Sequence, residues 1–100
     1  MADNHRKLVT IVTEAVLEAE LCAELKRQGA RGYTISNARG SGDRGVRDAG
    51  WQTSSNIRIE VVCTAEVAER IETCLRERFF ESYAMISFTS DVAVLRPDKF

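Results

Sequence analysis

The chain has 100 residues, 44% of them hydrophobic, and a formal net charge of −1, so we expect one domain, residues 1–100, with a single core. The near-zero charge excludes the broad basic field that drives non-specific nucleic-acid binding. No apolar run approaches the roughly 18 residues of a membrane span, and the polar first residues do not resemble a secretion signal, so we expect a cytoplasmic protein.

Residues 7–13 are apolar and β-branched and predict a strand. Leu8 and Val12 would point to one side of it, and Val9 and Ile11 to the other. Because both faces are apolar, both are expected to be covered in the folded protein.

A helix is predicted next, with Thr13 as its N-cap. Apolar residues recur at helical spacing from Val16 to Leu25, and Gly29 follows as a C-cap signal. Residues 32–37 predict a second strand. It leads directly into a segment rich in glycine and arginine.

The second half repeats the pattern of the first. Alternating apolar residues predict a strand over 57–63, and Thr64 would cap a helix whose apolar stripe ends at Phe79. Residues 83–89 predict a fourth strand with Ala84, Ile86 and Phe88 on one face, and 92–95 a short edge strand before Pro97.

This order of elements predicts an α+β, ferredoxin-like βαββαβ fold with a four-stranded antiparallel sheet. Its two helices would cover one face of that sheet. The doubly apolar first strand then needs a partner for the open face, so we expect a homo-oligomer.

The connection between the second and third strands is the most unusual segment of the chain. Residues 39–50 hold four glycines and three arginines, which together suit an oxyanion. Residues 40–45 match G-x-G-x-x-G, but no helical pattern follows, and no Lys-Ser/Thr pair completes a P-loop. A loop this long is either a ligand site or a solvated hairpin. The role of Trp51, within it, stays open.

Catalytic and metal-binding patterns are poor. The three cysteines (Cys22, Cys63 and Cys74) show no ligand spacing and are expected to be small buried or half-buried apolar residues. The single histidine, His5, has no partner cluster. We therefore expect neither an enzyme, nor a catalytic cofactor, nor a metal site.

Several motifs together resemble the PII-like signalling proteins of inorganic-carbon metabolism, closest to the carboxysome-associated PII-like protein and its bicarbonate-transporter-associated relative. The resemblance covers residues 7–91. It rests on Gly29-Ala30-Arg31-Gly32-Tyr33-Thr34, Asn37, Gly40, Gly42, Arg44, Val46-Arg47 and Phe80 to Tyr83-Ala84.

The resemblance implies a homotrimer that binds adenine nucleotide in clefts between subunits. ADP or AMP is the expected ligand, with ATP and cyclic AMP as alternatives, and bicarbonate beside it. The loop over about 38–56 would be the T-loop, which changes order with the ligand and docks on a target. The implied nucleotide-binding residues are Gly40, Ser41, Gly42, Arg44 and Arg47 at the phosphates, Thr34 and Ser36 near the ribose and base, and Tyr83, Ala84, Met85, Ile86 and Ser87 from the neighbouring subunit.

Two departures from the nitrogen-signalling PII proteins argue against nitrogen sensing through ATP and 2-oxoglutarate. The loop has no tyrosine for nucleotidylylation, and the glycine-rich connection between the second helix and fourth strand is missing. The chain also stops at Phe100 without the redox extension of some transporter-associated members, which favours the carboxysome-associated branch. A membrane bicarbonate transporter or a carboxysome-related protein is the expected partner. An assembly module without a small-molecule ligand remains the alternative, and the roles of Arg96 and Lys99 stay open.

Overall fold

Four strands and two helices follow the predicted order along the chain. The computed structural model describes residues 3–40 and 56–100. The main elements are β1 (His5–Glu14), α1 (Glu18–Arg27), β2 (Thr34–Ala38), β3 (Asn56–Cys63), α2 (Ala65–Arg78) and β4 (Ile86–Ala93), with short 3₁₀ turns η1 (Ala15–Leu17) and η3 (Pro97–Lys99).

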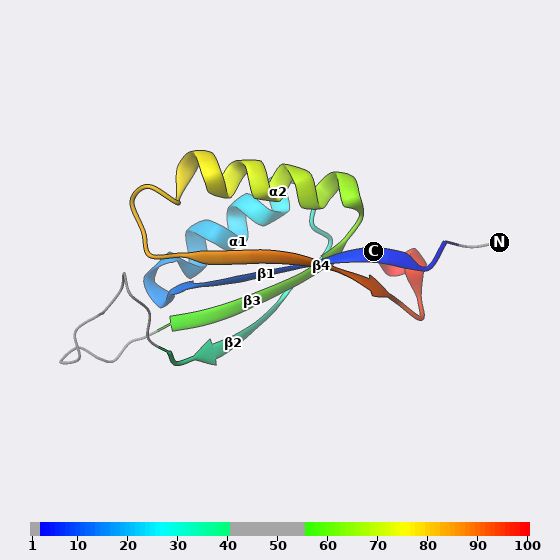
Figure 1. Cartoon of the computed structure of the whole chain (residues 1–100), viewed down its shortest axis with the longest axis horizontal. Coiled ribbons are helices and arrows are strands. Elements are labelled where there is room, and N and C mark those ends of the chain that lie inside the picture. The colour runs from blue at the N-terminus through cyan, green and yellow to red at the C-terminus, as the bar shows by residue number, and fades with distance from the viewer. Residues whose placement is uncertain (1–2, 41–55) are drawn as a thin grey trace.

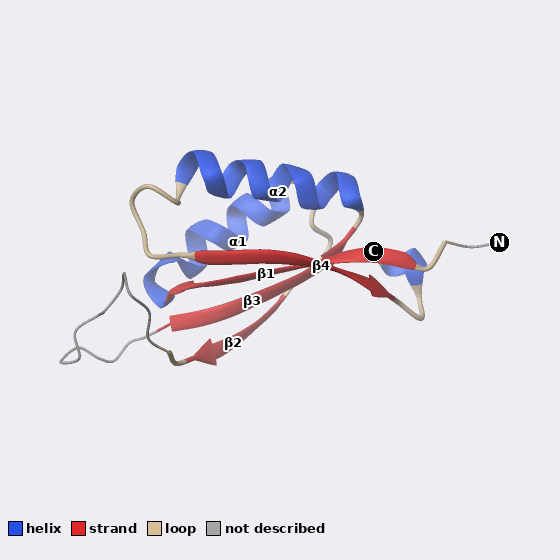
Figure 2. Cartoon of the chain, in the orientation of Figure 1, coloured by secondary structure: helices blue, strands red, loops and turns tan. Residues whose placement is uncertain are grey.

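The strands form one antiparallel sheet in the order β2-β3-β1-β4. Both helices lie on the same side of this sheet (Figure 1). Colouring by secondary structure shows the same two layers, with no described element over the other face (Figure 2). The predicted ferredoxin-like α+β fold is confirmed.

The core lies between the sheet and the helices. Alternate residues of the central strands, such as Val9 and Ile59, are 0% exposed, because side chains one residue apart point to opposite faces. Leu21 of α1 and Ile71 of α2 pack against them. Fully burying side chains of this size contributes about 1.5–3 kcal/mol each.

The open face of the sheet is apolar along β1 and β4. Leu8 and Val12 are half-buried there, whereas Ile86 and Phe88 are 60% and 50% exposed. The prediction that the first strand is apolar on both faces is confirmed. This surface lacks a cover among the described residues.

The predicted start of the first helix is wrong. Thr13 stays within β1, paired with Ile57, and its hydroxyl donates to the carbonyl oxygen of Ala84 at 3.4 Å. Because β1 pairs through Glu14, the helix cannot begin there. The chain turns through η1 instead, and Val16 is 80% exposed rather than on the helix stripe.

The ends of the edge strands also differ from the prediction. Backbone N–H groups of Ser82 and Tyr83 donate to the carbonyl oxygen of Phe79 at 3.1 and 3.0 Å, so the chain turns there and β4 begins only at Ile86. At its other end, β4 runs through Ala93, because β1 extends to His5 and provides a partner. The prediction of a separate short strand over 92–95 is therefore wrong. The second strand, β2, covers 34–38 instead of the predicted 32–37.

Both remaining cap predictions are confirmed. The hydroxyl oxygen of Thr64 accepts a hydrogen bond from the backbone N–H of Val67 at 3.3 Å. Gly29 has a φ of 106°, and Ala30 N–H donates to Leu25 C=O at 2.9 Å, the pattern that closes a helix at a left-handed residue. This cap fixes the direction in which the chain leaves α1.

A buried carboxylate ties the two helices together. Glu24 of α1 is 5% exposed and accepts hydrogen bonds from Arg27 and from Arg78 of α2. The Cys74 thiol donates to it at 3.6 Å. Burial alone would raise the pKa of the Glu24 carboxyl, but the two arginines outweigh it and hold the pKa below its ordinary value.

The cysteines agree with the expectation of small apolar roles. Cys63 and Cys74 are buried and Cys22 is half-buried, and all three are free thiols. Across residues 3–40 and 56–100, no cluster of three metal-ligating side chains occurs. In the same ranges, no helix is long and apolar enough to cross a membrane.

Candidate functional site

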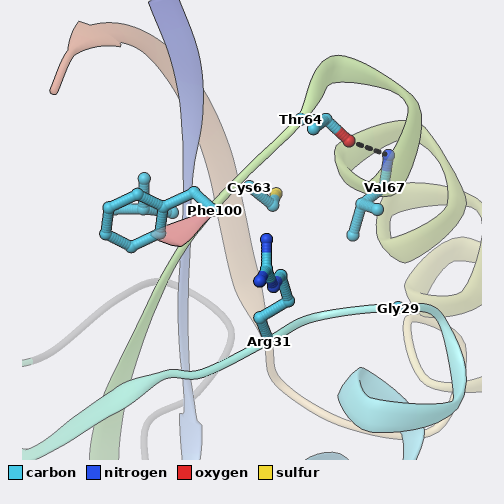
Figure 3. Close-up of a pocket in the computed structure, with 7 residues that line it drawn as sticks. Gly29, Arg31, Cys63, Thr64, Val67 and Phe100 are labelled. Carbon is cyan, nitrogen blue, oxygen red and sulfur yellow. Dashed lines mark hydrogen bonds between the residues drawn. The ribbon is translucent and has the colours of Figure 1, made fainter. Parts of the chain in front are cut away.

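A pocket of about 200 Å³ lies where α1 leads into β2 and where β3 leads into α2. The Gly29 cap brings the first of these connections beside the first turn of α2, as an added Cβ at Gly29 would lie 3.3 Å from the Val67 side chain. The pocket is lined by Gly29, Arg31, Val62, Cys63, Thr64, Val67 and Phe100 (Figure 3). Three segments far apart in the sequence therefore meet here.

Arg31 supplies the only charged side chain of the lining. Its guanidinium reaches toward Cys63, with Val67 and Phe100 to its two sides in the view of Figure 3, and it donates to the backbone carbonyl of Asp98 at 3.3 Å. Among the residues that the structure describes, no carboxylate forms an ion pair with it. Because a guanidinium carries five N–H donors, Arg31 keeps donors for a ligand.

The other side chains that line the pocket are uncharged. Burial, followed by the nearby Glu72 carboxylate, raises the pKa of the Cys63 thiol to about 11, so this thiol stays protonated at neutral pH. Val62 and Val67 are apolar, and the Thr64 hydroxyl is engaged in the helix cap. A flat, mostly apolar group with a few polar edges suits such a lining.

Three of the predicted site residues lie along β2 or just after it. Thr34 and Ser36 are exposed on the sheet face away from the helices, opposite Glu60 and Arg58 of β3. Gly40 follows the strand and is exposed, with open space around its Cα. The pocket and Gly40 thus lie at opposite ends of β2, which spans roughly 16 Å at about 3.3 Å per residue.

The residues predicted to come from a neighbouring subunit lie in the connection before β4 and in its first two positions. Tyr83 and Met85 are half-buried and pack against the core, and the Tyr83 ring lies 6.1 Å from that of Phe79. Ala84 is half-buried, Ile86 is exposed on the open face, and Ser87 turns toward the helix side with a buried hydroxyl that has no described partner.

Within one chain, the two predicted groups are not brought together. Ser36 pairs with Arg58, Arg58 with Val12, and Val12 with Ile86, so Ser36 and Ile86 lie at opposite edges of the sheet. Neighbouring strands are roughly 4.8 Å apart, which separates the two by about 14 Å. A site that uses both groups on one base needs a second copy of the chain.

The rest of the predicted phosphate-binding group, Ser41, Gly42, Arg44 and Arg47, lies outside the described residues, as does Trp51. Arg96 precedes η3 and Lys99 is within it. Neither of these two side chains lines the pocket.

The sequence alone predicts no binding role for Arg31, Thr64 or Phe100. Arg31 belongs to the Gly-Ala-Arg-Gly-Tyr-Thr motif, between the helix cap and the strand. A residue at that position is expected to lie at the end of the sheet. Thr64 was assigned only to the cap. No local sequence pattern indicates that Phe100 lines the pocket, because its position depends on how the chain folds back after β4.

Comparison with known proteins decides the family. The model of the nitrogen regulatory protein P-II family matches residues 6–99. The chain belongs to this P-II family.

Solved structures agree with this assignment, and the similar structures include PII-like members of the family. A PII-like signalling protein of Thermus thermophilus is 48% identical, with a TM-score of 0.83, over 96% of this chain and 95% of that one. The PII-like protein CPII of Thiomonas intermedia, in its complex with ADP and bicarbonate, is 27% identical with a TM-score of 0.84, over 96% and 94%. A further CPII structure holds ADP, AMP and bicarbonate, at 26% identity and a TM-score of 0.85, over 96% and 93%.

The resemblance to PII-like proteins that the sequence motifs carried is therefore confirmed. The chain is a PII-like member of the P-II family, and structures of the PII-like protein CPII contain ADP, AMP and bicarbonate.

Proposed function

We propose that this chain is a cytoplasmic regulatory sensor, not an enzyme, that binds ADP or AMP with bicarbonate beside it. One observation carries the proposal: CPII, which matches this chain over almost its whole length, was solved with ADP and bicarbonate bound. The Gly/Arg segment that follows β2 would supply an anion site, and the exposed side chains of β2 before it would lie beside the rest of the nucleotide.

In the proposed complex, the nucleotide lies along β2. Its phosphates contact Gly40, Ser41, Gly42, Arg44 and Arg47 beyond the end of the strand. Thr34 and Ser36, which are exposed on β2, lie near the ribose and base, and residues 83–87 of a neighbouring copy form the other wall of the base pocket.

A second copy of the chain completes each proposed site, and a homotrimer would hold three such sites in its clefts. The exposed apolar face of Ile86 and Phe88 supports self-association, because burying it removes apolar surface from water. Residues 83–87 of one copy would then approach β2 of the next, which brings together the two groups that a single chain keeps apart.

The output of the sensor is proposed to run through residues 38–56. Phosphate and bicarbonate oxygens would engage Arg44 and Arg47, which orders this T-loop and changes the surface shown to a target. The resemblance to carbon-metabolism proteins makes a bicarbonate transporter or a carboxysome-related protein the proposed partner. Inorganic-carbon uptake or fixation would then be the regulated process.

Calorimetric titration of ADP into wild type and Arg47→Ala tests the proposal. Charge-assisted hydrogen bonds contribute about 1.5–3 kcal/mol each, so Arg47→Ala should weaken ADP binding roughly ten-fold or more. Arg76→Ala is the matched control, since Arg76 is exposed on α2 and away from the proposed site. Unchanged ADP affinity in Arg47→Ala would contradict this assignment.

A thermal-shift screen separates the sensor from a ferredoxin-like assembly module without a small-molecule ligand. The ligands are AMP, ADP, ATP and cyclic AMP, each with and without bicarbonate. A ligand at 100 times its Kd stabilises the folded state by about 2.7 kcal/mol. Stabilisation by ADP or AMP that bicarbonate enhances supports the sensor, whereas no stabilisation by any of them supports the assembly module.

A further inference from the structure

The connection between α2 and β4 lies beyond the point where the pairing of β1 with β4 ends. The last pair of this ladder is Val12 with Ile86, so the connection enters the sheet only at its final residue. Figure 1 shows the connection at the end of the sheet where β1 leads into η1. Contacts other than strand pairing must therefore hold residues 79–85 in place.

At the α2 end, the backbone of the connection anchors itself. The N–H groups of Ser82 and Tyr83 donate to the carbonyl oxygen of Phe79 at 3.1 and 3.0 Å. The Tyr83 ring also lies 6.1 Å from the Phe79 ring. These contacts close the turn after the helix, and they leave the two residues before β4 to be held in another way.

At the β4 end, the anchor is Thr13 of β1. Its hydroxyl donates to the carbonyl oxygen of Ala84 at 3.4 Å. Among the residues that the structure describes, no other side chain donates a hydrogen bond to the backbone of residues 79–86. A side-chain hydrogen bond thus takes over where the backbone ladder of the two strands stops.

Thr13 can reach this carbonyl because β1 continues past its last pair with β4. Thr13 still pairs with Ile57 of β3 and lies on the helix side of the strand, as Val9 and Ile11 do. It is 2% exposed. A residue buried this deeply cannot contact a bound nucleotide, so any effect on binding must act through Ala84.

The bond to Ala84 fixes the orientation of the backbone just before β4. The side chains on either side of it, Tyr83 and Met85, pack against the core, and Ile86 then begins β4 on the open face. A carbonyl shielded from water needs a hydrogen-bond partner. Without the Thr13 hydroxyl, the connection is expected to shift until this carbonyl finds another donor.

We propose that Thr13 is a positioning residue for nucleotide binding, which holds residues 83–87 in the form of a binding wall through its hydrogen bond to Ala84. The proposal rests on the proposed function, in which this wall faces the base in the site of a neighbouring copy. It gives a role to the one predicted helix cap that the structure contradicts.

Thr13→Val and Thr13→Ser separate the hydroxyl from the packing of the side chain. Valine keeps the shape without the hydroxyl, and serine keeps the hydroxyl without one buried methyl group. A neutral hydrogen bond corresponds to about five-fold in an equilibrium constant. Thr13→Val should therefore weaken adenosine, AMP and ADP by the same factor, about five-fold, in calorimetric titrations. Thr13→Ser should retain wild-type affinity although its Tm falls.

Thr89→Val is the matched control. Thr89 lies on the same side of the sheet, opposite Val9, and its hydroxyl donates to Glu72 of α2 at 2.5 Å. Its loss removes one hydrogen bond of β4 outside the wall, so the affinity for all three ligands should stay unchanged. An equal loss of affinity in this control would mean that any weakening of β4 reduces binding, and would overturn the positioning role.

Two ligand-free measurements locate the effect in the connection. Amide hydrogen exchange over residues 82–86 should be faster in Thr13→Val than in wild type and unchanged in Thr13→Ser. Sedimentation equilibrium should show the same assembly for all variants. If Thr13→Val loses affinity together with assembly, the loss comes from dissociation of the copies and the positioning role is wrong.

The outcomes separate this proposal from the function on which it rests. If wild type binds ADP and Thr13→Val binds all three ligands as tightly as wild type does, the proposal is wrong and the proposed function stands. A greater loss in Thr13→Ser than in Thr13→Val would assign Thr13 to packing and would also overturn the proposal. If wild type binds none of the ligands, the proposed function is wrong and the role of Thr13 in binding fails with it.

Discussion

The two faces of the sheet differ sharply in how their apolar side chains are covered. On the helix side, Ile11 and Ile59 are 0% exposed, whereas on the other side Ile86 and Phe88 are 60% and 50% exposed. Ile11 and Ile59 belong to the central strands β1 and β3, whereas Ile86 and Phe88 belong to the edge strand β4. The difference shows that one half of the apolar pattern forms the core, whereas the other half stays exposed within a single chain.

The largest effect on stability is expected on the helix-covered face. Ile59→Ala removes buried methyl groups between the sheet and the helices and should lower the free energy of unfolding by about 2–5 kcal/mol, measured by urea denaturation. Ile86→Ala is the matched change on the open face and should cost less than about 1 kcal/mol at protein concentrations where the chain is monomeric. Equal losses in the two variants would mean that the faces do not differ as described.

An intermediate effect is expected on self-association. Phe88→Asp places a charge in the exposed apolar face and should weaken association at least about ten-fold, measured by sedimentation equilibrium. Leu95→Asp adds the same charge at an exposed position outside this face and should leave association unchanged. If Phe88→Asp assembles like wild type, another surface must form the interface.

The sequence predicted most of the fold because two patterns are local: the alternation of apolar residues in strands and their spacing of three to four residues in helices. Alternation over 57–63 and the stripe from Val67 to Phe79 identified β3 and α2 with bounds close to those observed. Thr13 and Val16 misled the prediction, because the extent of a strand depends on its partner, and β1 pairs with β3 through Glu14. Strand pairing is a non-local property that a single segment does not encode.

The candidate site was only partly predictable for the same reason. Thr34 and Gly40 lie in one local stretch of sequence, so the sequence alone could offer them as candidates, and their role in binding stays a prediction. The pocket needs the connection at Arg31, the end of β3 and Phe100, which meet only after the chain has folded. Glu24 is a similar case, because its burial depends on Arg78 from a different helix.

The smallest expected effect is on stability and depends on pH. It concerns Glu24, which joins the two helices that cover the inner face of the sheet. Two arginines hold the pKa of Glu24 below its ordinary value of 4.5, so the folded state favours the ionised carboxylate. The stability from this group is fully present above pH 4.5 and is lost as the pH falls through the lower pKa of the folded protein. Glu24→Gln should therefore be less stable than wild type at pH 7.

The pH dependence is what distinguishes a paired carboxylate from simple packing. The difference in urea midpoint between wild type and Glu24→Gln should narrow as the pH falls below 4.5, because wild type then loses the same charge that the variant lacks. Glu66→Gln is the control, since the Glu66 side chain is 79% exposed and lies 3.6 Å from Arg70, and exposed pairs contribute little. A difference that stayed constant from pH 7 to pH 3 would show that Glu24 stabilises the helices by shape rather than by charge. In that case the two helices would cover the sheet through their apolar contacts alone.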